Sequence, residues 1–152
     1  MSQQAKNKLV FKYKTNHDTM ECDCPDLKKC QPGNSKSYRI VHSDLDHKNN
    51  YTPPILIIPR TFKTCNETCG GYALSFFNSA DNAETHFKRV SGFSPKFVNT
   101  VGNCIAECDL KVSDGVVSKP NDKGHFDLHE YNESVFKDRF TIIRTIAHEK
   151  TA

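Results

Sequence analysis

Three cysteines lie within nine residues near the start of this chain, at Cys22, Cys24 and Cys30. Their neighbours are mostly Asp, Glu, Lys and Pro, and Pro32-Gly33 follows them. Because Pro and Gly punctuate turns, the segment is predicted to be a polar loop and not part of a hydrophobic core. Cysteines in such a loop indicate a metal site before they indicate core packing.

Zinc is the predicted metal, because it takes four tetrahedral ligands and prefers thiolate sulfur and imidazole nitrogen. The first loop supplies three thiolates, and one further residue supplies the fourth ligand: His17, Cys65 or Cys69. Two alternatives stay open. The loop cysteines form disulfides if the protein is exported, or they are free surface thiols.

Size and composition favour a single intracellular domain. The chain has 152 residues and a formal net charge of +3, which predicts one domain over residues 1–152 without a strong nucleic-acid signature. It lacks an apolar run of the ~20 residues that cross a membrane. It also shows no apolar signal segment at its start, so the expected location is the cytoplasm, where thiols stay reduced. The odd count of seven cysteines argues weakly against a closed disulfide set.

Alternating and continuous apolar runs predict strands along most of the chain. Pro53-Pro54 and Pro59 bound a four-residue apolar run, Ile55-Leu56-Ile57-Ile58, that is typical of a strand buried on both faces. The other predicted strands cover residues 9–14, 38–42, 72–77, 103–112, 116–118, 125–131 and 140–146.

One helix is clearly marked, over residues 79–91. Ser79 is a suitable N-cap, Lys88 and Arg89 fall in the last turn, and Gly92 follows. Phe87 lies on its apolar face, which is expected to pack on the sheet.

The order of these segments predicts an α+β fold, with a mostly antiparallel sheet of about seven or eight strands and one main helix (79–91). Asp114-Gly115 predicts a hairpin turn between the strands 103–112 and 116–118. Cys104 and Cys108 alternate with apolar residues on one strand face, so they are expected in the core.

The strand at 125–131 carries the second candidate site. Phe126 and Leu128 face the core, which puts His125, Asp127 and His129 together on the opposite face. Such a row offers a base, an orienting carboxylate and a second base. The favoured interpretation is nevertheless an ordinary solvent-facing side of an amphipathic strand.

Three hypotheses for function follow. The preferred one is a small soluble intracellular zinc-binding module that binds a protein or a nucleic acid, with no membrane association. The first alternative is a small enzyme that acts on a nucleotide or other anionic substrate through His125, Asp127 and His129. The second alternative is an exported, disulfide-bonded binding domain.

Overall fold

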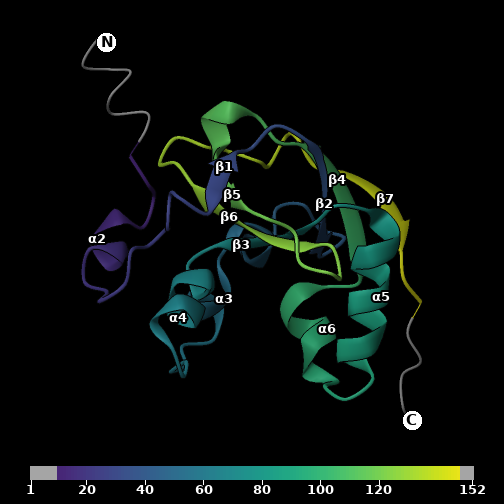
Figure 1. Cartoon of the computed structure of the whole chain (residues 1–152). Coiled ribbons are helices and arrows are strands. Elements are labelled where there is room, and N and C mark those ends of the chain that lie inside the picture. Colours follow the sequence, from purple (N-terminus) through teal and green to yellow (C-terminus); the bar gives the residue numbers. More distant parts are fainter. Residues whose placement is uncertain (1–9, 148–152) are drawn as a thin grey trace.

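The computed structural model describes residues 10–147, and these form one seven-stranded antiparallel sheet with helices packed against it (Figure 1). The order across the sheet is β1-β5-β6-β3-β2-β4-β7. The strands are β1 (Cys30–Pro32), β2 (Lys36–Val41), β3 (Leu74–Phe77), β4 (Cys104–Asp109), β5 (Gly115–Ser118), β6 (His125–Glu130) and β7 (Thr141–Thr145).

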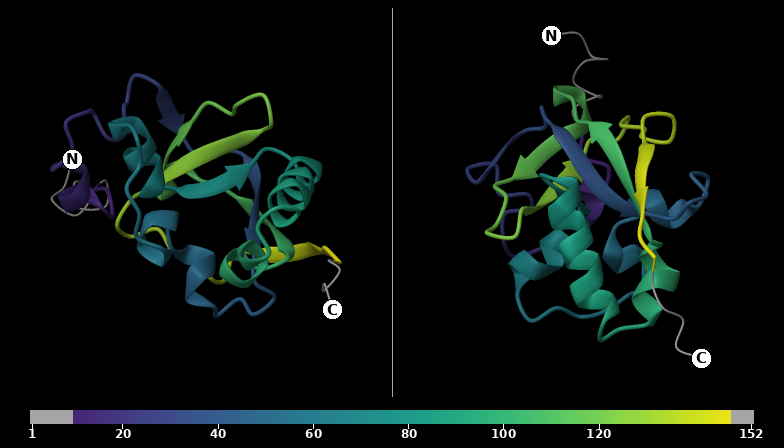
Figure 2. Two further views of the ribbon diagram at one scale, coloured as in Figure 1. Left: turned by 90° about the horizontal axis from the view of Figure 1, so that it is seen from below. Right: turned by 90° about the vertical axis from the view of Figure 1, so that its right-hand side faces the viewer.

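The helices lie in two separate groups (Figure 2). One group, α5 and α6, lies near β4 and β7, and the other lies toward β1. The helices are α2 (Lys14–His17), α3 (Pro54–Ile57), α4 (Cys65–Gly71), α5 (Ala80–Ser91) and α6 (Lys96–Val101), with 3-10 turns η1 (Lys48–Tyr51) and η2 (Val112–Asp114).

Each face of the sheet has its own apolar core. On one face Leu74, Phe76 and Leu128 pack with Phe136 and Phe140 from the segment that precedes β7. On the other face α5 lies across β2, β3 and β4, and its side chains Ala83 and Phe87 pack against strand residues such as Ile105. Burying apolar area on both faces is what holds the layers together.

The sheet opens between β2 and β3. β2 pairs with β4 at six successive positions, but it pairs with β3 at one, Tyr38 with Phe77. Asn50 of η1 takes over part of the missing ladder, because its side-chain oxygen accepts from the His42 N–H at 2.7 Å. Its carbonyl oxygen accepts from Arg39 Nε at 2.8 Å. Asn50 therefore satisfies polar groups of this segment that β3 does not pair with. The separation of β2 from β3 also leaves room for a cavity.

The predicted α+β class is confirmed, and so is the main helix. Ser79 caps α5 by accepting a hydrogen bond from the Asn82 N–H, and Phe87 is fully buried on its inner face. Cys104 and Cys108 are buried in the core as expected.

Two predicted strands near the start of the chain are wrong. The apolar run 55–58 belongs mainly to α3, with Pro53 as its N-cap and Pro54 as its first residue. Proline suits the first helical turn, and Leu56 and Ile58 are exposed. Within the predicted strand 9–14, Phe11 makes only an isolated bridge with Tyr131, and Lys14 already begins α2. Leu9 lies outside the described residues.

The predicted hairpin at Asp114-Gly115 is also wrong. β4 lies between β2 and β7, whereas β5 pairs with β1 and β6. Asp114 is buried and bound to Arg139, so η2 turns into the protein and not back along β4. Gly115 has φ +147° and lies so close to the His129 carbonyl that a side chain would clash there.

Candidate functional site

The cysteine loops are held by two disulfides, Cys22–Cys65 and Cys24–Cys69. The predicted zinc-binding module is therefore wrong, because a sulfur in a disulfide cannot act as a thiolate ligand. Cys30 is also away from this cluster: it lies on β1 opposite Ser118 and is a free, half-buried thiol. Burial, with help from Asp26 and Asp127, raises the pKa of the Cys30 thiol.

The disulfides connect the loop before β1 to the helix α4 before β3. Thr64 caps α4 by accepting from the Glu67 N–H, so Cys65 and Cys69 lie four residues apart on a helix, about one turn. This spacing puts both sulfurs on one helix face, where Cys22 and Cys24 bond to them. Of the predicted metal ligands, His17 lies beside Cys24.

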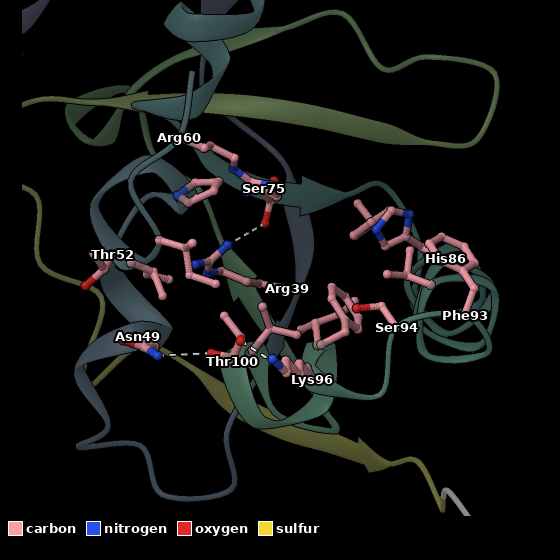
Figure 3. A pocket seen from close by; sticks show the side chains of 18 residues that line it. Arg39, Asn49, Thr52, Arg60, Ser75, His86, Phe93, Ser94, Lys96 and Thr100 are labelled. Carbon is pink, nitrogen blue, oxygen red and sulfur yellow. Dashed lines mark hydrogen bonds between the residues drawn. The ribbon is translucent and has the colours of Figure 1, made fainter. Parts of the chain in front are cut away.

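A cavity of about 560 Å³ lies where the sheet opens (Figure 3). β2 and β3 form its floor, α5 and α6 form one wall, and the segment from η1 to residue 60 forms the other. The lining residues are Arg39, Ile40, Asn49, Thr52, Pro54, Ile57, Ile58, Arg60, Ser75, Phe77, His86, Val90, Phe93, Ser94, Lys96, Phe97, Thr100 and Val101.

The charged groups of the cavity are all positive. Among the described residues that line it, Arg39, Arg60 and Lys96 are cationic and none is acidic. Arg39 is the buried one, at 7% exposure, and burial lowers its pKa to about 10, so it stays protonated at neutral pH. Figure 3 shows its guanidinium near the centre of the cavity.

Arg39 has N–H donors that no described residue uses. Its Nε donates to the Asn50 carbonyl at 2.8 Å and one terminal nitrogen donates to the Ser75 carbonyl at 2.9 Å. A guanidinium has five N–H donors, so three are left. Among residues 10–147, no carboxylate oxygen lies within 4.0 Å of the Arg39 guanidinium. The buried Glu130 carboxyl acts on it from farther away and partly opposes the lowering of the Arg39 pKa, and the Phe76 ring lies 5.9 Å from the guanidinium carbon. A buried cation without a carboxylate partner is costly, and an anionic ligand would supply one.

The rest of the lining is apolar and partly aromatic. Phe77 forms part of the floor, Phe97 lies beside His86 at a ring distance of 6.1 Å, and Phe93 at the rim is 74% exposed. Ile57 and Ile58 of the α3 segment face them across the cavity. An exposed aromatic ring at the mouth of a cavity is a suitable surface for a flat ligand group.

The polar face of β6 is less exposed than the predicted solvent-facing side of an amphipathic strand, and whether His125, Asp127 and His129 are inert stays a prediction. His129 is 5% exposed, and the other two side chains are about 30% exposed. Strand pairing puts Asp127 opposite Ser75, and the Ser75 hydroxyl lies 3.1 Å from His125 Nε2. Ser75 lines the cavity, so this face adjoins it.

The three side chains do not form a catalytic triad. Asp127 Oδ1 approaches the same nitrogen, Nε2 of His125, at 3.7 Å, whereas a triad carboxylate must hold the other ring nitrogen. Burial lowers the pKa of His125 and raises the pKa of Asp127 to about 6, so the pair is not an ion pair at neutral pH. A catalytic role for this face stays a prediction.

Burial keeps several histidines neutral. It lowers the pKa of His129 to about 4, with His17 adding to the shift, and it lowers the pKa of His86 to about 4, with Arg89 and His125 adding. The pKa of His17 is also lowered by burial. Burial also raises the pKa of two carboxyl groups, Asp127 and Glu130, so that these groups bind protons more readily in the folded protein.

Lowering the pH from 7 to 5 is expected to destabilise the fold. Below pH 6.5 the unfolded chain binds protons at His86 and His129. In the folded protein the same two histidines stay neutral until about pH 4. Each excess proton costs about 1.4 kcal/mol of stability per pH unit. Asp127 opposes this between about pH 6 and 4, since its folded form takes up a proton first. Urea unfolding at both pH values checks the sign, and an unchanged or higher stability at pH 5 would contradict it.

Sequence reasoning missed the cavity residues. Arg39 and Ser75 each lie inside a predicted strand, where a single polar residue does not by itself indicate a site. One feature of the sequence indicated the site: Arg39 lies two residues from Val41 and so shares its strand face, which is a buried one.

No protein family, curated protein or solved structure was found to match this chain significantly. Within residues 10–147, the helices are too short and too polar to cross a membrane.

Proposed function

We propose that this protein is a disulfide-bonded domain that binds a small anionic ligand with a flat apolar part, of the nucleotide class, in the cavity between β2 and β3. The observation that carries the proposal is Arg39, a buried cation on the cavity floor with unused donors and no carboxylate in direct contact among the described residues. Arg suits phosphate because its planar fork donates two parallel hydrogen bonds.

The size and layout of the cavity support this ligand class. Its volume of about 560 Å³ lies within the ~300–1,000 Å³ of small-molecule sites. Arg60 and Lys96 at the exposed rim add positive potential that attracts an anion. The aromatic and aliphatic walls match a base or similar ring.

The disulfides bear on where the domain works. Disulfides persist in oxidising compartments and are rare in the cytosol, so an exported protein fits them better than the cytoplasmic location expected from the sequence. The size of the cavity suits a small molecule and gives no support to a protein or nucleic-acid partner, which stays a prediction.

Arg39→Lys is expected to weaken binding of adenosine 5′-diphosphate by about 10- to 100-fold, since a charge-assisted hydrogen bond contributes about 1.5–3 kcal/mol. Lysine keeps the charge but loses the planar fork. Isothermal titration calorimetry measures the affinity, and circular dichroism checks that the variant folds.

The matched control is Lys63→Met, which removes an exposed cation three residues beyond Arg60 that does not line the cavity. It should leave the affinity within about twofold. Titrations with adenosine and with inorganic pyrophosphate separate the two halves of the ligand, and both should bind more weakly than the diphosphate. The proposal is wrong if the unmodified protein binds none of the three, or if Lys63→Met weakens binding as much as Arg39→Lys.

A further inference from the structure

A second cluster, separate from the cavity, lies where α2 packs against β6. His17 ends α2 and His129 lies on β6, and their rings meet edge to face with centroids 5.8 Å apart. Both are buried, at 6% and 5% exposure. One ring nitrogen of each and the Cys24 sulfur lie within 4.8 Å of one another.

The two histidines each hold a buried nitrogen that lacks a hydrogen-bond partner. These atoms are His17 Nε2 and His129 Nδ1, which find no partner in the described part of the chain. Leaving a buried polar atom unpaired costs about 1–3 kcal/mol, so such a pair calls for an explanation.

Another histidine pair shows what ordinary packing looks like in this protein. His42 and His47 stack with centroids 3.8 Å apart. There, His42 Nε2 contacts the Thr100 carbonyl at 3.0 Å, and His47 Nδ1 accepts from the Asn49 N–H. One nitrogen of each ring in that pair has a hydrogen-bond partner, whereas one buried nitrogen of each ring in the pair His17 and His129 has none among the described residues.

The surroundings of His17 and His129 select the kind of ion. Both rings are neutral ligands, the Cys24 sulfur is neutral in its disulfide, and the nearby rings of Phe11 and Tyr72 are uncharged. The Asp18 carboxylate, next to His17 in the chain, is charged but contributes no atom to the cluster. No carboxylate oxygen from residues 10–147 joins the cluster. A divalent ion buried among neutral ligands would keep its full charge, whereas a soft monovalent ion costs less to bury. Imidazole and neutral sulfur are ligands that copper accepts.

We propose that His17 and His129 bind one Cu(I) ion through one ring nitrogen each, with the Cys24 sulfur of the intact disulfide as a weak third contact. Two metal–imidazole bonds of ~2.0 Å span about 4 Å, so the cluster needs to close by less than about 1 Å. The site uses different residues from the cavity, so it does not depend on the ligand proposed there.

The test is an anaerobic Cu(I) titration against the chelator bicinchoninate, with ascorbate to keep copper monovalent without reducing disulfides. The protein carries Cys30→Ser, because this half-buried free thiol would itself bind Cu(I). One Cu(I) per chain is expected, with the number of titratable thiols unchanged. His17→Ala and His129→Ala should each weaken binding at least tenfold.

The matched control is His47→Ala, which removes a histidine from the other close pair and should leave Cu(I) binding unchanged. If His129→Ala fails to fold by circular dichroism, His17→Ala decides, since His17 lies at the end of a four-residue helix. The proposal is overturned if the Cys30→Ser protein takes up no copper or if His17→Ala retains it. It is also overturned if copper binds only after the disulfides are reduced, because the ligands would then be thiolates.

Discussion

Replacing all four bridged cysteines by alanine is expected to lower the free energy of unfolding by about 4 kcal/mol or more. The disulfides link residues 43 and 45 positions apart, Cys22 with Cys65 and Cys24 with Cys69. In the chain-entropy account, closing one loop of this length restricts the unfolded chain by about 4 kcal/mol. Urea unfolding of the variant and the unmodified protein measures the difference.

The two disulfides should not contribute additively. Cys22–Cys65 and Cys24–Cys69 close almost the same loop, so either one alone removes most of the freedom of the unfolded chain. The variant Cys22→Ala with Cys65→Ala should therefore lose clearly less than half of what the fourfold variant loses. If the losses from removing each disulfide alone add up to the loss from removing both, the disulfides act through independent local packing and not through closing one shared loop. Peptide mapping after alkylation of unreduced protein provides the covalent check.

Arg139→Met is expected to cost about 3–5 kcal/mol at pH 7, because it leaves the Asp114 carboxylate buried without its cation. Asp114 is 1% exposed, and Arg139 binds both of its oxygens, at 2.6 and 2.7 Å. Ser134 and the Lys111 N–H complete the shell. Burial by itself would raise the pKa of Asp114, but the hydrogen bonds from Arg139, Lys111 and Ser134 outweigh it and lower the pKa.

The loss in Arg139→Met should shrink at low pH. Without the guanidinium, Asp114 takes up a proton more readily, and the neutral acid is cheaper to bury than the carboxylate. The control is Arg144→Met, because Arg144 binds Asp81 and Glu84 at the surface, where ion pairs contribute about 0–1 kcal/mol. Urea unfolding at pH 7 and pH 4 compares the two variants. Equal losses in both, or a loss for Arg139→Met that is the same at each pH, would contradict this account.

The sequence by itself determined the parts of the fold that depend on neighbours along the chain. The cap at Ser79 and the apolar face with Phe87 specify α5 without help from the rest of the molecule, because capping and helical periodicity are local properties. Alternation likewise specified β4 and the burial of Cys104 and Cys108. The α+β class followed from such local signals taken together.

Local signals failed where a distant group competes for the same residues. Asp114-Gly115 reads as a hairpin, but the ion pair with Arg139, 25 residues away, turns Asp114 inward and gives β5 another partner. The apolar run 55–58 reads as a buried strand, but Pro53 and Pro54 begin a helix there and β2 pairs with β4 and not with it.

The candidate sites were decided by the tertiary structure. The cysteine pattern identified the reactive residues, but cysteine spacing does not specify partners, so it could not tell a metal site from Cys22–Cys65 and Cys24–Cys69. The polar row on β6 was visible in the sequence, but its burial was not. The cavity was not visible at all, because Arg39 and Ser75 become neighbours only where β2 and β3 separate. Which strands part, and which side chains then face each other, depends on packing between segments far apart in the chain.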